Sequence, residues 1–208
     1  MNEILKQIGA LRLVPVVVID DAKDARPLAE ALMAGGLPCM EITFRTPAAA
    51  SAIKAASEIS GMLVGAGTVL NIDTVKRAMD CGAKFIVSPG LSPKVVEYCV
   101  SNNIPITPGI ATPSEIEMAI EHGLEVVKFF PAEALGGVKT LKAISAPYVG
   151  MKFMPTGGIT ETNLPEYLKL PAVLACGGSW MVAKDMIAKG GFAKITELTK
   201  AAVKLAKN

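Results

Sequence analysis

The sequence has only one histidine and four cysteines in 208 residues, which limits the metal and redox chemistry open to it. The cysteines are scattered through the chain at Cys39, Cys81, Cys99 and Cys176. Because no CxxC pair occurs among them, we expect reduced thiols and neither a disulfide framework nor a zinc site. One histidine and few strand-borne carboxylates cannot furnish the usual three ligands of a catalytic metal. His122 precedes Gly123 at an apparent helix end, where we expect a capping or surface role.

A strong charge of either sign and a long apolar run are also missing. The net charge of +2 indicates no nucleic-acid or membrane partner. No apolar run approaches the roughly 20 residues of a membrane span, and residues 1–6 lack the pattern of an export signal. We therefore expect a cytoplasmic protein.

What the chain does have is apolar residues, which make up 51% of it against 19% charged residues. This balance is typical of a compact, enzyme-like protein with a large core. The length favours one domain over two, and no linker or low-complexity segment divides the chain. We expect a single domain over residues 1–208.

Short apolar runs alternate with helical periodicity along the whole chain. Units of about two dozen residues in this order imply parallel strands joined by right-handed crossovers, and eight of them favour a closed (β/α)8 TIM barrel, here with a short N-terminal helix at 2–10. The expected strands are 13–20, 39–45, 63–69, 84–89, 104–109, 126–131, 152–155 and 173–176. The expected helices are 22–34, 47–60, 72–81, 93–101, 113–121, 138–144, 163–170 and a final helix ending near Lys207.

In such a barrel the chemistry gathers where strands end and loops enter the helices. Glycines follow the last two expected strands, as Gly157-Gly158 and as Gly177-Gly178 with Ser179. Barrels commonly bind phosphate there through backbone N–H groups, so we expect a phosphorylated substrate. The structural alternative is that these glycines only make tight turns between strand and helix.

Lys128 stands inside the apolar run 126–130, where a charged group needs a partner or a chemical use. Glu41 stands similarly in the second expected strand, and period-2 alternation places it on one face with Thr43 and Arg45. One interpretation is a buried structural network in which Glu41 pairs with Lys128 or Arg45. The other is that Lys128 forms an imine with a carbonyl substrate, Glu41 moves protons and Arg45 holds a carboxylate.

Three other charged residues compete for these roles. Lys84 and Lys152 begin their strands, at the end of the barrel away from the chemistry, so we expect them to be solvated. Glu133 follows Pro131 in a loop, where it would be more solvated and less fixed than Glu41.

Two stretches of the sequence resemble the active-site signatures of the class I KDPG/KHG aldolases, which release pyruvate from 2-dehydro-3-deoxy-6-phosphogluconate or 4-hydroxy-2-oxoglutarate. They are 36–45 (GLPCMEITFR) and 123–136 (GLEVVKFFPAEALG). The resemblance spans nearly the whole chain and includes the stretches 64–68, 88–90, 155–159 and 177–180.

The resemblance implies roles for particular residues. Lys128 would be the Schiff-base lysine and Glu41 the proton-transfer residue. The pyruvate end of the pocket would be lined by Arg45, Thr68, Pro89, Phe130 and Thr156, and the phosphate would be held by Gly157, Gly158, Gly177, Gly178 and Ser179. The family is metal-free, needs no cofactor and is homotrimeric, and its phosphogluconate activity belongs to the Entner-Doudoroff pathway of carbohydrate metabolism.

Other functions are kept open beside 2-dehydro-3-deoxy-6-phosphogluconate cleavage. The enzyme could prefer 4-hydroxy-2-oxoglutarate or 2-dehydro-3-deoxy-6-phosphogalactonate. From a different class, the chain could be a phosphate-binding barrel that isomerises or senses a sugar phosphate without an imine. A metal-dependent aldolase is a further alternative, which chelation would reveal.

Overall fold

The computed structural model describes residues 1–207, so the last residue of the expected domain, Asn208, lies outside the described residues. Helices and strands alternate along the chain, with short 3-10 helices labelled η. The elements are α1 (Glu3–Leu11), β1 (Leu13–Val17), η1 (Ala22–Asp24), α2 (Ala25–Ala34), β2 (Cys39–Thr43), α3 (Ala49–Ser57), β3 (Leu63–Gly67), α4 (Ile72–Asp80), β4 (Phe85–Val87), α5 (Pro93–Ser101), β5 (Ile106–Thr107), β6 (Gly109–Ile110), α6 (Pro113–Glu121), β7 (Val126–Phe129), η2 (Glu133–Leu135), α7 (Gly137–Ser145), β8 (Lys152–Phe153), α8 (Leu164–Leu168), β9 (Cys176–Gly178), η3 (Trp180–Val182), α9 (Lys184–Ala188) and α10 (Phe192–Lys207).

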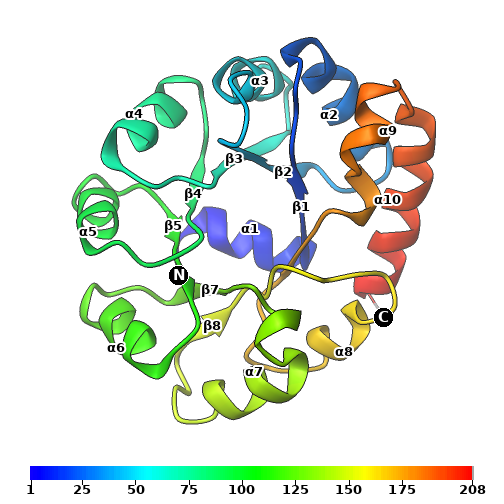
Figure 1. Cartoon of the computed structure of the whole chain (residues 1–208). Coiled ribbons are helices and arrows are strands. Elements are labelled where there is room, and N and C mark those ends of the chain that lie inside the picture. The colour runs from blue at the N-terminus through cyan, green and yellow to red at the C-terminus, as the bar shows by residue number, and fades with distance from the viewer. Residues whose placement is uncertain (208) are drawn as a thin grey trace.

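The strands form two parallel sheets, which run β5-β4-β3-β2-β1-β9 and β6-β7-β8. Figure 1 shows the strands curling around a common centre with the helices outside them. Parallel neighbours require crossover connections, and here the helices supply them. The expected parallel α/β class is therefore confirmed.

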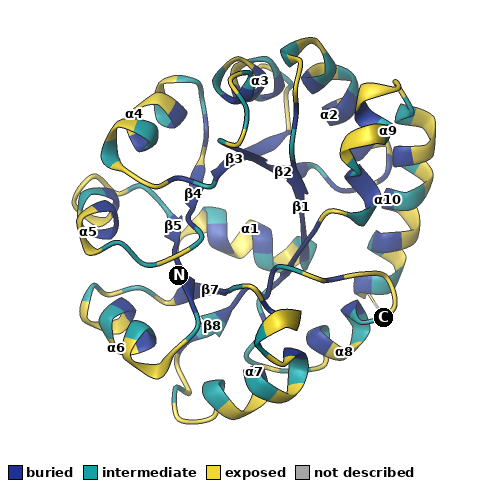
Figure 2. Ribbon diagram, viewed as in Figure 1, coloured by how far each residue is buried: buried dark blue, intermediate teal, exposed yellow. Residues whose placement is uncertain are grey.

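Burial on both faces explains why the strands are continuous apolar runs. One apolar cluster lies between the strands and the outer helices, and Figure 2 shows the buried residues on the inner faces of those helices. A second cluster fills the interior, where Leu5 and Ile8 of α1 pack against strand residues such as Val14, Phe85 and Val126. Burying each of the two α1 side chains stabilises the fold by about 1.5–3 kcal/mol. The expected N-terminal helix thus forms and covers one end of the ring of strands (Figure 1).

The expected strand 104–109 is divided in two, into β5 and β6, with Pro108 between them. Proline has no N–H to donate to a neighbouring strand, so the ladder is interrupted at that residue. Its carbonyl still accepts a hydrogen bond from the backbone N–H of Lys128, at 2.8 Å. The chain therefore continues in the strand direction across the break.

The last expected strand, 173–176, is displaced to β9. Pairing with β1 sets its position, because Cys176, Gly177 and Gly178 lie opposite Leu13, Val14 and Pro15. The prediction that these two glycines belong to a loop was wrong, since they continue the strand. The single final helix was also wrong: η3 and α9 precede α10, and Gly190, with a φ of 69°, separates those two α-helices.

Several smaller expectations can be compared directly. His122 is the C-terminal capping residue of α6, as predicted. All four cysteines are free thiols. Within residues 1–207, no helix combines the length and the apolar composition that crossing a membrane requires.

Candidate active site

Lys128 and Glu41 meet inside the ring of strands. The lysine lies on β7 and the glutamate on β2, with Nζ and Oε1 3.8 Å apart. Both residues are almost fully buried, at 3% and 1% exposure. Lys128 Nζ also lies 4.8 Å from the centre of the Phe130 ring. The pairing of Glu41 with Lys128, which one interpretation of the sequence offered, is therefore present.

The carboxylate of Glu41 has no hydrogen-bond partner among the described residues, on either oxygen. Buried polar groups are normally satisfied, and those that are not concentrate where a group has a chemical use. Glu41 is close enough to Lys128 for electrostatic attraction, but the separation exceeds a hydrogen-bond length. Both carboxylate oxygens are therefore available to a substrate or a water.

One glycine of β3, Gly67, makes the room that the carboxylate of Glu41 occupies. Gly65 lies opposite Glu41 in the β2–β3 pair, and Gly67 lies two residues further along β3. A Cβ on Gly67 would overlap Glu41 Oε1 and come within 2.7 Å of its Cγ and Cδ. Because Gly67 has no side chain, the carboxylate of Glu41 can lie against β3 at this position.

Cys39 lies two residues before Glu41 in β2, on the same face of the strand and nearer to α1. Burial raises the pKa of its thiol, and the neighbouring charge of Glu41 raises that pKa further. The thiol is therefore neutral and contributes to packing rather than to nucleophilic chemistry.

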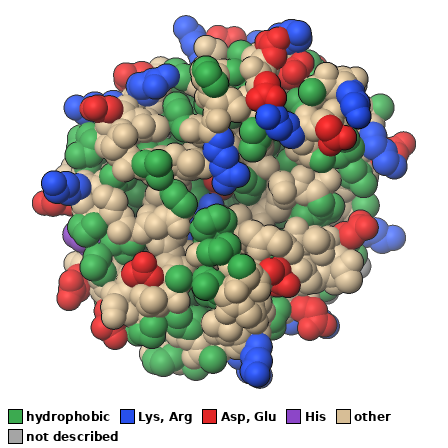
Figure 3. All heavy atoms as spheres, viewed as in Figure 1, with side chains coloured by type: hydrophobic (Ala, Val, Ile, Leu, Met, Phe, Trp, Pro, Cys, Tyr) green, Lys and Arg blue, Asp and Glu red, His purple; other side chains and the backbone are tan. Residues whose placement is uncertain are grey.

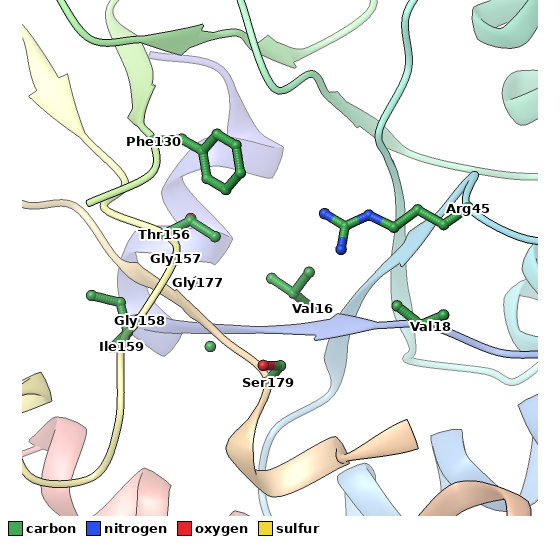
Figure 4. A pocket seen from close by; sticks show the side chains of 11 residues that line it. Val16, Val18, Arg45, Phe130, Thr156, Gly157, Gly158, Ile159, Gly177 and Ser179 are labelled. Atoms are coloured by element: carbon green, nitrogen blue, oxygen red, sulfur yellow. The ribbon is translucent and has the colours of Figure 1, made fainter. Parts of the chain in front are cut away.

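A pocket of about 230 Å³ opens at the end of the ring opposite α1; Phe130, the neighbour of Lys128, lines it, whereas Lys128 and Glu41 do not. Figure 3 shows the same face, with basic side chains reaching towards its hollowed centre. The pocket is lined by Val16, Val18, Arg45, Phe130, Thr156, Gly157, Gly158, Ile159, Gly177, Gly178 and Ser179. Figure 4 shows Arg45 on one side of the space, with Phe130 and the glycine-rich segments opposite it. Eight of these residues were expected from the sequence.

Arg45 reaches the pocket from a turn rather than from a strand. β2 ends at Thr43, and the backbone N–H of Arg45 donates to the Thr43 carbonyl at 2.8 Å. The Thr43 hydroxyl donates to the Val17 carbonyl at 2.9 Å, so this side chain ties two strands together. The shared face that alternation predicted therefore extends through Glu41 and Thr43, and Arg45 reaches the site by the turn that follows.

Thr68 positions the guanidinium of Arg45. Arg45 Nε donates to Thr68 Oγ1 at 3.0 Å. Thr68 has a φ of 56°, a left-handed conformation that costs a residue with a Cβ about 1–2 kcal/mol. Strained backbone of this kind is concentrated at functional sites. The remaining donors of Arg45 can bind a carboxylate.

The segment from Thr156 to Ile159 turns three backbone N–H groups outward. The carbonyls of Thr156 and Gly157 accept hydrogen bonds from the backbone N–H groups of Ala132 and Glu133, at 2.8 and 3.0 Å. The carbonyl of Gly158 accepts from Asn163 Nδ2 at 3.0 Å. In a trans peptide the N–H points away from the carbonyl, so the N–H groups of residues 157–159 face the other way.

These three N–H groups have no acceptor among residues 1–207, and all three residues line the pocket. Gly157 and Gly158 both have positive φ values, 97° and 82°, a conformation that favours glycine. Successive unpaired N–H groups form an anion-binding concavity. The arrangement suits a phosphate group.

Pro89, an expected site residue, and the three competing charged residues all lie outside the pocket lining. Pro89 does not line the pocket; its carbonyl packs against Gly109, which pairs with Lys128. Glu133 is exposed and accepts a hydrogen bond from the hydroxyl of Tyr167. Lys84 is exposed ahead of β4, and Lys152 begins β8 with its amine bonded to the Pro171 carbonyl at 2.8 Å.

Sequence reasoning missed some pocket residues. Val16 and Val18 face the pocket from the first strand unit, and the alternation that was applied to Glu41 would have found them. Ile159 contributes a backbone N–H, which no side-chain pattern reveals. The need for an empty position at Gly67 depends on where Glu41 lies, and this is a property of the fold.

Comparison with known proteins adds independent findings. The family model described as "KDPG and KHG aldolase" matches residues 2–198. A protein of Treponema pallidum named 2-dehydro-3-deoxy-phosphogluconate aldolase is 50% identical over 201 residues, which cover 96% of each chain. The crystal structure of the 2-keto-3-deoxy-6-phospho-gluconate aldolase of Zymomonas mobilis is 43% identical, covers 95% of each chain and superposes with a TM-score of 0.91.

A third similar protein carries a trapped reaction intermediate. It is the KDPG aldolase of Legionella pneumophila, whose structure holds pyruvate captured at low pH as a covalent carbinolamine. That chain is 40% identical to this one, with a TM-score of 0.91 and coverage of 95% of this chain and 97% of the other.

Proposed function

The chain belongs to the KDPG and KHG aldolase family, and from that membership we propose that it is a class I aldolase. Its substrate is 2-dehydro-3-deoxy-6-phosphogluconate, which it cleaves to pyruvate and glyceraldehyde 3-phosphate. The observation that carries the proposal is the buried pair of Lys128 and Glu41 next to Phe130, which lines the pocket. The amine can attack a carbonyl carbon, and the carboxylate beside it can move protons.

The proposed reaction begins with attack of Lys128 Nζ on the C2 carbonyl of the substrate. The resulting carbinolamine loses water to form an iminium ion. Glu41, directly or through a water, removes the proton of the C4 hydroxyl while the C3–C4 bond breaks, and the bonding electrons pass into the iminium to give an enamine. Glyceraldehyde 3-phosphate departs. Glu41 returns the proton to C3, and water hydrolyses the iminium to release pyruvate and the free lysine.

The other pocket residues hold the two ends of the substrate in this proposal. Arg45, positioned by Thr68, binds the carboxylate, and Phe130 and Thr156 border the pyruvate end. The N–H groups at 157–159 bind the phosphate, together with Gly177, Gly178 and Ser179 on the neighbouring strand end. No cofactor or metal takes part in these steps.

Trapping with borohydride tests the residue and the mechanism together. Reduction in the presence of pyruvate is expected to convert Lys128 irreversibly to Nε-(1-carboxyethyl)lysine, because hydride adds to the C=N bond of the imine. Lys128→Met is expected to abolish the adduct, and Lys84→Met, which removes an exposed lysine just before β4, is expected to keep it. Modification at another residue, or full activity of Lys128→Ala, would overturn the imine in favour of a barrel that acts on a sugar phosphate without one. Loss of activity with EDTA would favour a metal-dependent aldolase.

Substrate preference within the family is a separate question. Cleavage rates on 2-dehydro-3-deoxy-6-phosphogluconate and on its galactonate epimer are expected to exceed the rate on 4-hydroxy-2-oxoglutarate, because the first two carry the phosphate that the loop at 157–159 suits. A faster rate on the unphosphorylated acid would make the hydroxy-oxoglutarate reaction the principal one.

We also propose that the two sheets belong to one closed (β/α)8 barrel, in one domain. Support comes from the continuity of β5 and β6 across Pro108 and from isolated parallel bridges at Phe153 with Val173 and Thr156 with Gly177. Resemblance to the family favours a homotrimer, which light scattering would detect as three times 21.7 kDa. The cytoplasmic location stays a prediction from the sequence.

A further inference from the structure

The anion-binding loop is held from behind by α8. Asn163, the residue before this helix, bridges the loop with its side chain: Oδ1 accepts from the backbone N–H of Thr160 at 2.8 Å, and Nδ2 donates to the carbonyl of Gly158 at 3.0 Å. One amide therefore connects both ends of the segment 158–160. The bond to Gly158 fixes the peptide whose N–H belongs to Ile159.

A second connection from α8 passes through Glu133. Tyr167, one turn further along the helix, is fully buried, and its hydroxyl donates to the Glu133 carboxylate. The backbone N–H of Glu133 donates to the Gly157 carbonyl, and a Cβ on Gly158 would come within 2.6 Å of Glu133 Cβ and Cγ. Glu133 thus lies directly against both glycines.

Tyr167 keeps its proton across the working pH range. Burial raises the pKa of its phenol, and the hydrogen bond to Glu133 raises that pKa further. The hydroxyl is therefore a lasting donor to a carboxylate that is otherwise exposed. Without it, the Glu133 side chain would be free to turn into solvent.

We propose that Asn163 and Tyr167 are positioning residues for phosphate recognition, an inference that rests on the proposed aldolase function. Gly157 and Gly158 have wide conformational freedom, so the direction of their peptides depends on what their carbonyls bind. If the Gly158–Ile159 peptide turned over, a carbonyl would face the phosphate where an N–H now does. The α8 contacts select the donor arrangement, and with it the preference for a phosphorylated substrate.

The test compares a reaction that uses the phosphate with one that does not. The first is cleavage of 2-dehydro-3-deoxy-6-phosphogluconate, and the second is exchange of the pyruvate methyl protons in D2O, which needs only the lysine and the proton-transfer residue. Asn163→Leu is expected to raise KM for the phosphorylated substrate about tenfold, because both hydrogen bonds from Asn163 to the loop are lost. Tyr167→Phe, which acts one contact further away, is expected to raise it about threefold. Both variants should leave the exchange rate within about twofold of the wild type.

Two matched controls lose similar bonds elsewhere. Asn102→Leu removes the bond from Asn102 Nδ2 to the Tyr98 carbonyl, at 2.7 Å, and Tyr148→Phe removes the bond from its hydroxyl to Glu117 Oε1, at 3.1 Å. Neither residue lies near the pocket lining, so both variants are expected to keep the wild-type KM.

The KM values and the exchange rates together decide whether Asn163 and Tyr167 position the loop. An unchanged KM in both α8 variants, or equal losses in cleavage and exchange, would overturn the positioning role. If Asn163→Leu fails to fold, Tyr167→Phe, which removes one oxygen atom, decides alone. Failure of the aldolase proposal is distinguishable, because the wild-type protein would then show no pyruvate exchange and no adduct on Lys128.

Discussion

Replacing Gly67 by alanine tests whether catalysis depends on the position of the Glu41 carboxylate. The new methyl group would overlap Oε1 and lie 2.7 Å from Cγ and Cδ, whereas ordinary contact begins at 3.4 Å. The carboxyl carbon must therefore retreat by at least 0.7 Å, the difference between those two distances. Gly67 lies in β3 and its φ is not among the positive ones, so alanine adds no backbone strain. Since the obstructing atoms end a flexible side chain, we expect the protein to fold.

A misplacement of about 1 Å at a catalytic group can cost on the order of 100-fold in rate. We therefore expect kcat for cleavage to fall about 100-fold in Gly67→Ala, while borohydride trapping of pyruvate on Lys128 continues, because the amine itself is not displaced. Steady-state kinetics and thermal unfolding would be measured together. Gly150→Ala is the matched control, since nothing lies within 4 Å of its added Cβ. A Gly67→Ala enzyme with wild-type kcat would refute the dependence on the position of Glu41.

Three further predictions concern stability and binding. Lys128→Met leaves the Glu41 carboxylate buried without its partner, so the free energy of unfolding in urea should fall by about 3–5 kcal/mol; an unchanged midpoint would show that the pair is not charged in the folded protein. Thr68→Val removes the acceptor for Arg45 Nε, and the KM for pyruvate in the exchange reaction should rise about threefold, whereas an unaltered KM would mean that Arg45 needs no such support. Burial raises the pKa of the Cys99 thiol from 9.0 to about 11. Its contribution to stability is therefore fully present below pH 9.0 and is lost as the pH rises towards 11. Cys99→Ala should lose less stability over that interval, and an identical loss would contradict this assignment.

Most of the parallel α/β fold could be predicted because each strand is buried on both faces and each helix on one. A strand buried on both faces has a continuous run of apolar residues, and a helix buried on one face has apolar residues at a period of 3.6. The errors occur where that signal is absent. β9 contains two glycines, which look like a loop when taken alone and form a strand because β1 lies beside them. The division of the fifth strand depends on one residue, Pro108.

The site residues that could be predicted are those whose charge is unusual for an apolar strand. Lys128 and Glu41 are charged residues in apolar strands, so they stand out in the sequence, and the side-chain alternation gives the face that Glu41 shares with Thr43. Asn163 and Tyr167 carry no such signal, because an asparagine before a helix and a buried tyrosine are ordinary features. Their contacts with the loop at 157–159 depend on the angle at which α8 meets the strands. Only the folded chain supplies that angle.

The helix α1 has a consequence for the order of events. Leu5 and Ile8 fill the interior on the α1 side, whereas the pocket lies at the other end of the ring, where Phe130, the neighbour of Lys128, lines it. A substrate bonded to the lysine through its keto acid portion has its other end towards the pocket. The keto acid portion must enter first and leave last, and the aldehyde fragment, nearer the opening, is free to depart while the three-carbon fragment is still attached. The fold therefore favours the same order of product release that an imine mechanism requires.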